Sequence, residues 1–184
     1  MFAQALSEIV RRLDGAKARH LLDQYALIGG FAVSAWGVPR ATHDVDFALA
    51  LGAADADALS RFLQAEFEPG ESDDPLRGVF RASIALGDHA IPVQLILLPR
   101  AWDAVAFRDV KALPLFDCTV PVVSWQVLVL LKLYAGGPQD ILDAQQILAV
   151  RQPTPAERQS VAALADEVGL SAPWCALAGQ WLQA

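Results

Sequence analysis

One segment, residues 25–50, constrains the fold of this chain more than any other. The apolar residues 25–28 predict a short buried strand that ends at Gly29-Gly30, and residues 31–36 favour a short helix that stops before the next glycine and proline. Residues 44–50 alternate in polarity and predict a second strand, led by two aspartates. The segment therefore predicts a unit in which a glycine pair joins a strand to a helix and an acidic pair opens the next strand.

This unit suits a metal-bound nucleotide. Gly29 and Gly30 have no side chains, so backbone N–H groups and a helix start can approach an anion such as a triphosphate. Asp44 and Asp46 are two residues apart on a strand, so their carboxylates share a face and can coordinate Mg²⁺ or Mn²⁺. Alone, a glycine pair is usually a turn and an Asp-x-Asp pair a solvated strand end. Their order in one unit is more specific, and it predicts an NTP on the glycines and the metal on the aspartates.

The rest of the chain predicts an α+β fold, a small mixed β-sheet flanked by helices with a helical C-terminal part. We expect a core at residues 1–122 and a helical subdomain packed on it at 123–184. The expected strands after residue 50 are a hairpin at 79–86 and 90–98 and an edge strand at 111–120. The expected helices lie at 2–22 (one or two helices), 53–67, 125–134, 138–150, 155–168 and from about 173, with a loop at 68–78.

Composition limits the cellular location and the partners that we expect for this protein. The chain has 184 residues, of which 54% are hydrophobic and 19% charged, which favours a packed globule or an additional interface such as that of a homo-oligomer. The most apolar stretch, residues 120–135, is interrupted by polar residues and is too short to span a membrane. The N-terminal charges follow the apolar residues, unlike a secretory signal, so we expect a cytoplasmic protein without a membrane partner.

Charge and cysteine content exclude some classes of site. A net charge of −7 works against loose binding to nucleic-acid backbones, so an RNA acceptor would require a local basic patch. Cys118 and Cys175 are too few for a disulfide framework and lack the neighbours of a zinc site.

The motif resembles the nucleotidyltransferase superfamily with the polymerase-beta-like fold. Gly29-Gly30 and Asp44-Val-Asp46 match its signature of a glycine turn followed by an Asp-x-Asp pair. The resemblance implies transfer of a nucleoside monophosphate from an NTP to an acceptor hydroxyl, with Asp44 and Asp46 as catalytic metal ligands.

The closer resemblance is to the AbiEii-type toxin branch and its uncharacterised short relatives, over roughly residues 25–148. It is carried by Arg-x-Thr-x-Asp-x-Asp at residues 40–46 and by a later Lys-x-x-Ala-Gly with two following aspartates, Lys132, Asp140 and Asp143. It implies an RNA or protein acceptor and enzymes that are often toxins of toxin–antitoxin pairs, hence an antitoxin partner. By analogy Arg40, Lys132 and Asp140 join the nucleotide site.

Each of these three residues also has a structural interpretation. Arg40 could pair with Asp44 or Asp46 instead of a phosphate. Lys132 could be a surface lysine on an otherwise buried helix. Asp140 could stabilise the N-terminus of its helix, where an acidic side chain is favourable without any ligand. Relatives carry basic residues where this chain has Gly137 and Gln139, which leaves fewer charges for a triphosphate.

A glutamine stands where the superfamily places its third carboxylate. In the strand at 90–98 the matching position is Gln94, whose amide can orient a ligand but cannot act as a carboxylate base. Asp88, on the preceding turn, is an alternative carboxylate if the hairpin register brings it close. Three hypotheses follow: a nucleotidyltransferase with Asp44, Asp46 and Gln94 at its catalytic centre; a catalytically degenerate module that binds a nucleotide or a partner protein; and a purely structural domain.

Overall fold

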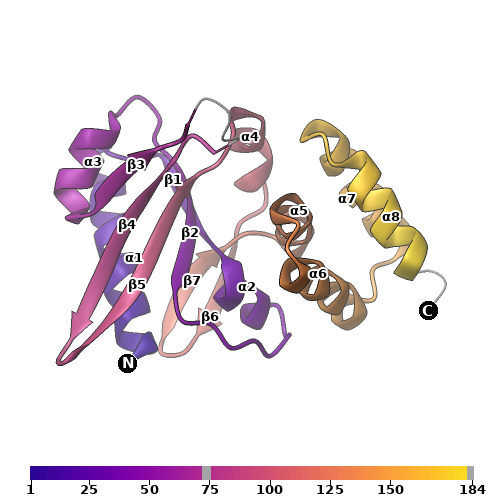
Figure 1. Cartoon of the computed structure of the whole chain (residues 1–184), viewed down its shortest axis with the longest axis horizontal. Coiled ribbons are helices and arrows are strands. Elements are labelled where there is room, and N and C mark those ends of the chain that lie inside the picture. Colours follow the sequence, from indigo (N-terminus) through magenta and orange to yellow (C-terminus); the bar gives the residue numbers. More distant parts are fainter. Residues whose placement is uncertain (72–75, 182–184) are drawn as a thin grey trace.

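A seven-stranded mixed sheet forms the centre of the protein. The computed structural model describes residues 1–71 and 76–181, and its strands lie side by side in the order β3-β4-β5-β2-β1-β7-β6 (Figure 1). The strands are β1 Gln24–Ile28, β2 Val45–Ala50, β3 Glu66–Pro69, β4 Gly78–Leu86, β5 His89–Leu97, β6 Lys111–Leu115 and β7 Cys118–Val122. Because parallel and antiparallel pairs occur together and helices flank the sheet, the predicted α+β class is confirmed.

The unit predicted from the glycine and aspartate pairs forms the middle of this sheet. β1 and β2 are antiparallel, and their register sets Ile28 opposite Asp46. The connecting helix α2 Gly29–Ala35 begins at the glycines themselves rather than after them, since Gly29 turns the chain from strand to helix with φ +66°. β2 runs parallel to β5, so Asp46 faces Gln94 across the ladder. The turn, the acids and the glutamine therefore meet where the end of β1 and the start of β2 lie beside the middle of β5.

The predicted helix at residues 53–67 is too long. The helix α3 spans Ala56–Leu63, its N-terminus capped by the Asp55 carboxylate, and Gln64 ends it in the left-handed conformation with φ +55°. Phe67 consequently lies on β3, where its ring centroid is 4.6 Å from that of Phe80. The loop expected at 68–78 thus begins as a strand, because the apolar spacing that suggested a longer helix continues across the end of α3.

The two hairpins of the sheet differ in how well the sequence predicted them. The hairpin of β4 and β5 is confirmed, with a two-residue turn at Gly87 and Asp88. The single edge strand predicted at 111–120 is instead a second hairpin, β6 and β7. β7 pairs in parallel with β1 through Leu27 and Val122, so β6 alone forms that edge.

Helices cover the sheet and complete the C-terminal third. The helix α1 Phe2–Ala18 packs against β4 and α3. Four further helices lie together beyond the α2 end of the sheet (Figure 1): α5 Trp125–Ala135, α6 Pro138–Arg151, α7 Pro155–Glu167 and α8 Ser171–Trp181. The α5 helix is almost wholly buried and is capped by Ser124, whose hydroxyl accepts from the Val127 N–H. Two short helices complete the set, η1 Arg100–Trp102 and α4 Asp103–Ala106.

The C-terminal helices follow the predicted pattern to within a few residues. The division into units at 1–122 and 123–184 stays a prediction. Within residues 1–71 and 76–181, none of the helices combines the length and the apolar character that a membrane crossing requires.

Candidate active site

The Gly29 backbone lies directly against the Asp46 carboxylate. A Cβ added at Gly29 would overlap Asp46 Oδ2 and lie only 2.8 Å from Cγ, closer than real Cβ atoms approach other atoms. The positive φ at Gly29 adds a second reason for glycine. The first glycine of the pair is therefore required by the position of the site's own acid.

Gly30 is in close contact with the segment that leads into β2. A Cβ at Gly30 would lie 2.7 Å from Thr42 Cβ and 3.3 Å from Arg40 Nη1. The glycine pair thus makes room for Asp46 on one side and for the 40–44 segment on the other. The sequence predicted open backbone for a phosphate, and the structure adds that protein side chains already border this backbone.

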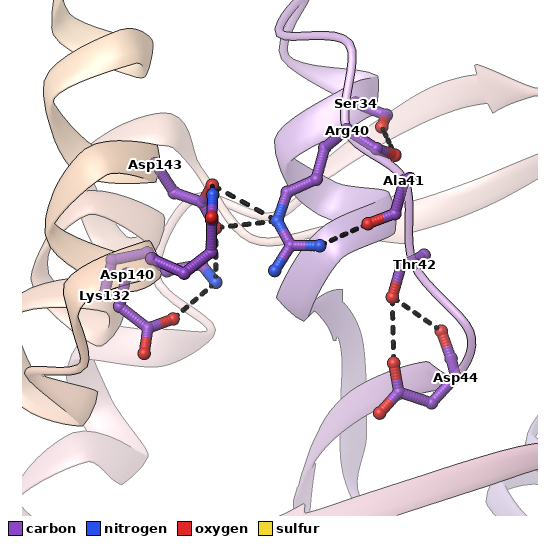
Figure 2. Close-up of polar contacts among 9 residues, drawn as sticks. Ser34, Arg40, Ala41, Thr42, Asp44, Lys132, Asp140 and Asp143 are labelled. Atoms are coloured by element: carbon purple, nitrogen blue, oxygen red, sulfur yellow. Dashed lines mark hydrogen bonds and ion pairs between the residues drawn. The ribbon is translucent and has the colours of Figure 1, made fainter.

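Asp44 is held by two donors just before β2 begins. Thr42 Oγ1 donates to Asp44 Oδ1 over 2.8 Å, as Figure 2 shows, and Gln94 Nε2 donates to Asp44 Oδ2 over 3.3 Å. Gln94 also lies opposite Asp46 in the β2–β5 register, so the structure places it beside both acids. Only the Arg-x-Thr-x-Asp spacing pointed to Thr42, and it assigned this residue no role.

Asp88 does not reach this site. It lies in the turn before β5, six residues from Gln94 along an extended strand, a separation of about 20 Å. The alternative in which Asp88 supplies the third carboxylate is therefore wrong. Among the described residues no group of three or more His, Cys, Asp or Glu side chains could hold a metal ion.

Asp46 is destabilised in its ionised form. Burial is the largest cause and the negative charge of Asp44 the next, and together they raise the Asp46 pKa to about 7, although Lys132 and Arg40 act in the opposite direction. A buried carboxylate beside a second carboxylate is an environment that a divalent cation would relieve. The donor set of two carboxylates and an amide oxygen is also of the type that Mg²⁺ accepts.

A pocket of about 280 Å³ opens beside Asp46. Its polar wall contains Gly29, Asp46, Lys132 and Asp140, so the structure brings together two residues from the glycine and aspartate motifs and two from the helical part. The other wall is mostly apolar and comes from the ends of β1 and β5, from α5 and from one residue just before β4: Ile28, Leu76, Ile96, Leu98, Leu128, Leu131, Tyr134 and Ala135.

Lys132 is a buried cation and not a surface lysine. Its side chain is 9% exposed, and Nζ lies 2.8 Å from both Asp140 Oδ1 and Asp143 Oδ2. Asp140, in the first turn of α6, is thus an ion-pair partner on the pocket wall.

Arg40 pairs with Asp143 rather than with Asp44 or Asp46. Its Nε lies 3.0 Å from Asp143 Oδ2, and its Nη1 donates to the Ala41 carbonyl (Figure 2). Asp143 therefore joins both cations, although the sequence pointed to it only through the spacing of the later aspartates.

Comparison with known proteins gives similarity at the level of structure. No family model matches the chain, and no curated protein matches it. The solution structure of the antibiotic-resistance factor ANT(2'')-Ia is similar with a TM-score of 0.54 at 14% identity, over 100% of both chains. An antigenic nucleotidyltransferase-like protein from Paracoccidioides brasiliensis has a TM-score of 0.50 at 16% identity, over 93% of this chain and 92% of that one. The chain has the nucleotidyltransferase fold.

A crystal structure of ANT(2'')-Ia in complex with adenylyl-2''-tobramycin is also similar, with a TM-score of 0.46 at 13% identity over 95% of this chain and 97% of that one. These identities are low, so the similarity concerns the fold.

Proposed function

We propose that this chain is a metal-dependent nucleotidyltransferase that moves a nucleoside monophosphate from an NTP to an acceptor hydroxyl and releases pyrophosphate. One observation carries the proposal: in a nucleotidyltransferase fold, the Gly29 turn, the Asp46 carboxylate and the buried Lys132 line a single pocket, and the negative charge of Asp44 acts on Asp46 from beside it. Transfer of this kind needs a bound polyphosphate, a place for metal ions and room for an acceptor, and little covalent chemistry from the protein.

The residues fit these roles. Asp44 and Asp46 would hold Mg²⁺ or Mn²⁺, which supplies charge stabilisation for the phosphoryl oxygens. Thr42 keeps Asp44 turned toward the site through its hydroxyl. Gly29 and Gly30 would carry the polyphosphate, with Arg40 beside Gly30 and Lys132 on the pocket wall as the cations. Gln94 would orient a ligand rather than accept a proton.

The test is transfer from labelled NTPs. Wild-type protein is incubated with each of the four α-labelled NTPs, with Mg²⁺ or Mn²⁺, and with separate protein, RNA and small-molecule fractions of a cell extract. We expect label in one fraction, lost in Asp46→Asn and kept in Asp88→Asn, since Asp88 lies in a turn remote from the site. Absence of label with every NTP, metal and fraction, combined with transfer by Gln94→Asp, would contradict an active wild-type enzyme.

A second function is favoured by one specific contact. Gln94 donates its amide N–H to Asp44, where a third carboxylate would repel it. This supports the alternative of a catalytically degenerate module that binds a nucleotide, or a partner protein, without transfer. The two functions differ in one measurement, because the module binds Mg²⁺-NTP and releases no pyrophosphate, whereas the enzyme releases it in proportion to labelled acceptor.

The AbiEii-type role is the most specific part of the proposal. It rests on residues 40–46 and on Lys132, Asp140 and Asp143, and it implies an RNA or protein acceptor and an antitoxin partner. If the chain is such a toxin, induced expression arrests growth and Asp46→Asn relieves the arrest. Equal growth with both proteins at equal abundance would argue against a toxin while leaving transfer itself untouched.

A further inference from the structure

Asp143 is a fully buried carboxylate that lies behind the proposed phosphate site. Its side chain is 0% exposed and does not line the pocket. It accepts from Arg40 Nε over 3.0 and 3.2 Å, and Gln139 Nε2 donates to it over 2.9 Å. Gln139 contacts Oδ1 of Asp143, and Lys132 Nζ lies 2.8 Å from Oδ2. Both carboxylate oxygens are therefore used by the protein itself, and none of these contacts involves Asp44 or Asp46.

The two cations that meet at Asp143 come from different parts of the fold. Arg40 follows α2, and its guanidinium lies next to Gly30. Lys132 comes from α5 and lines the pocket with Gly29. Figure 2 shows Arg40 and Lys132 reaching Asp143 from opposite sides. The carboxylate thus fixes Arg40 beside Gly30 and Lys132 on the wall of the pocket that Gly29 also lines.

The cost of burying this carboxylate points to a role beyond stability. Burial alone would raise the Asp143 pKa, but the hydrogen bonds from Lys132 and Gln139 and the charges of Lys132 and Arg40 outweigh it and hold the pKa below its ordinary value. Buried ion clusters of this kind contribute little net stability relative to apolar packing, because desolvation offsets the attraction. What the cluster provides is a fixed geometry for two long and otherwise flexible side chains.

We propose that Asp143 is a positioning residue, which holds Arg40 and Lys132 in place so that both contact the polyphosphate of a nucleotide bound at the Gly29-Gly30 turn. The inference rests on the proposed function. It assigns Asp143 no contact with metal or nucleotide. Asp140 differs, because it lines the pocket and pairs with Lys132 but not with Arg40.

The experiment compares Asp143→Asn with a matched variant, Glu167→Gln. Glu167 on α7 pairs with Arg108 over 2.7 Å, so it also joins the N-terminal part of the chain to a C-terminal helix, without a contact to the site. Calorimetry measures the Kd of pyrophosphate with Mg²⁺, and spin resonance measures the Kd of Mn²⁺ alone. We expect the pyrophosphate Kd to rise about 10- to 100-fold in Asp143→Asn, the range seen when supporting partners of a site are removed.

The control variant and the metal readout separate positioning from general damage. Glu167→Gln should keep the pyrophosphate Kd within about twofold of wild type, as surface substitutions do. Mn²⁺ alone should bind Asp143→Asn as it binds wild type, because Asp143 makes no contact with Asp44 or Asp46, the proposed metal ligands. A pyrophosphate Kd in Asp143→Asn equal to that of Glu167→Gln would overturn the inference, and so would an equal loss of Mn²⁺ binding.

Arg40→Lys keeps the inference testable if Asp143→Asn does not fold. Lysine retains the positive charge but cannot bind Asp143 through Nε and the Ala41 carbonyl through Nη1 at the same time. Positioning predicts that Arg40→Lys loses about as much pyrophosphate affinity as Arg40→Gln, whereas charge alone predicts wild-type affinity. If wild-type protein binds neither pyrophosphate nor any NTP, the proposed function fails together with the inference; if wild type binds and the variants bind equally, the inference fails alone.

Discussion

Replacing Gly29 by alanine tests the close approach on which the site depends. The new Cβ would overlap Asp46 Oδ2 and lie 2.8 Å from Cγ and 2.9 Å from Cβ of Asp46. Normal carbon contacts begin near 3.5 Å, so the Asp46 side chain must move. Gly87 provides a matched control, because its φ of +63° is nearly that of Gly29 and an added Cβ would have nothing within 4 Å.

The expected cost follows from these two environments. Both alanine variants place a Cβ in the left-handed region, at a cost of about 1–2 kcal/mol each. Gly29→Ala also overpacks the site, which adds about 2 kcal/mol. For a domain of this size that difference lowers the Tm of Gly29→Ala below that of Gly87→Ala by about 4–8 °C. The displaced carboxylate should also weaken Mn²⁺ binding in Gly29→Ala by about tenfold or more.

Two measurements check this prediction. Calorimetric melting without metal gives the Tm of both variants, and an Mn²⁺ titration followed by spin resonance gives their metal affinities. If Gly29→Ala has the same Tm as Gly87→Ala and binds Mn²⁺ as wild type does, the Asp46 carboxylate does not lie against the Gly29 backbone.

Three further substitutions have defined outcomes. Because the Asp46 pKa is raised to about 7, the native chain keeps a proton that the unfolded chain has lost, so metal-free wild type loses stability as pH rises from about 4 to about 7. In EDTA, the Tm of Asp46→Asn should therefore be higher than that of wild type at about pH 8 and equal to it at about pH 4. The same Tm difference at both pH values would contradict the buried acid. Thr42→Val removes the O–H donor to Asp44 and should weaken Mn²⁺ binding about tenfold, and unchanged affinity would show that this contact does not orient the carboxylate. Trp36→Phe removes the indole N–H that donates to the Val123 carbonyl over 2.9 Å, and urea titration should give a loss of about 1 kcal/mol or more; no loss would mean that water replaces this bond.

Local sequence was enough for the centre of the sheet and for the first hairpin. The glycine and aspartate pairs predict their own geometry because turn conformation and strand alternation act over a few residues. Gln94 was assigned from its strand position, and the parallel register with β2 places it opposite Asp46. The end of α3 was missed, because the apolar spacing up to Phe67 does not reveal the left-handed turn at Gln64.

The ion cluster behind the site lay beyond what spacing predicts. Arg40 and Asp143 are 103 residues apart in the chain, and their contact depends on how α5 and α6 pack against α2 and the segment that follows it. The sequence allowed Arg40 to pair with Asp44 or Asp46, and it allowed Lys132 to be a surface residue. Only the packing of two distant segments decides such pairings, because long-range contacts leave no periodic signal.

The most direct test of the metal-nucleotide site is a crystal soaked with Mn²⁺ and a non-hydrolysable NTP. We expect anomalous density for Mn²⁺ beside Asp44 and Asp46, with the polyphosphate along Gly29 and Gly30 and Lys132 facing it. Metal or nucleotide bound elsewhere, with the two carboxylates free of both, would contradict the site itself.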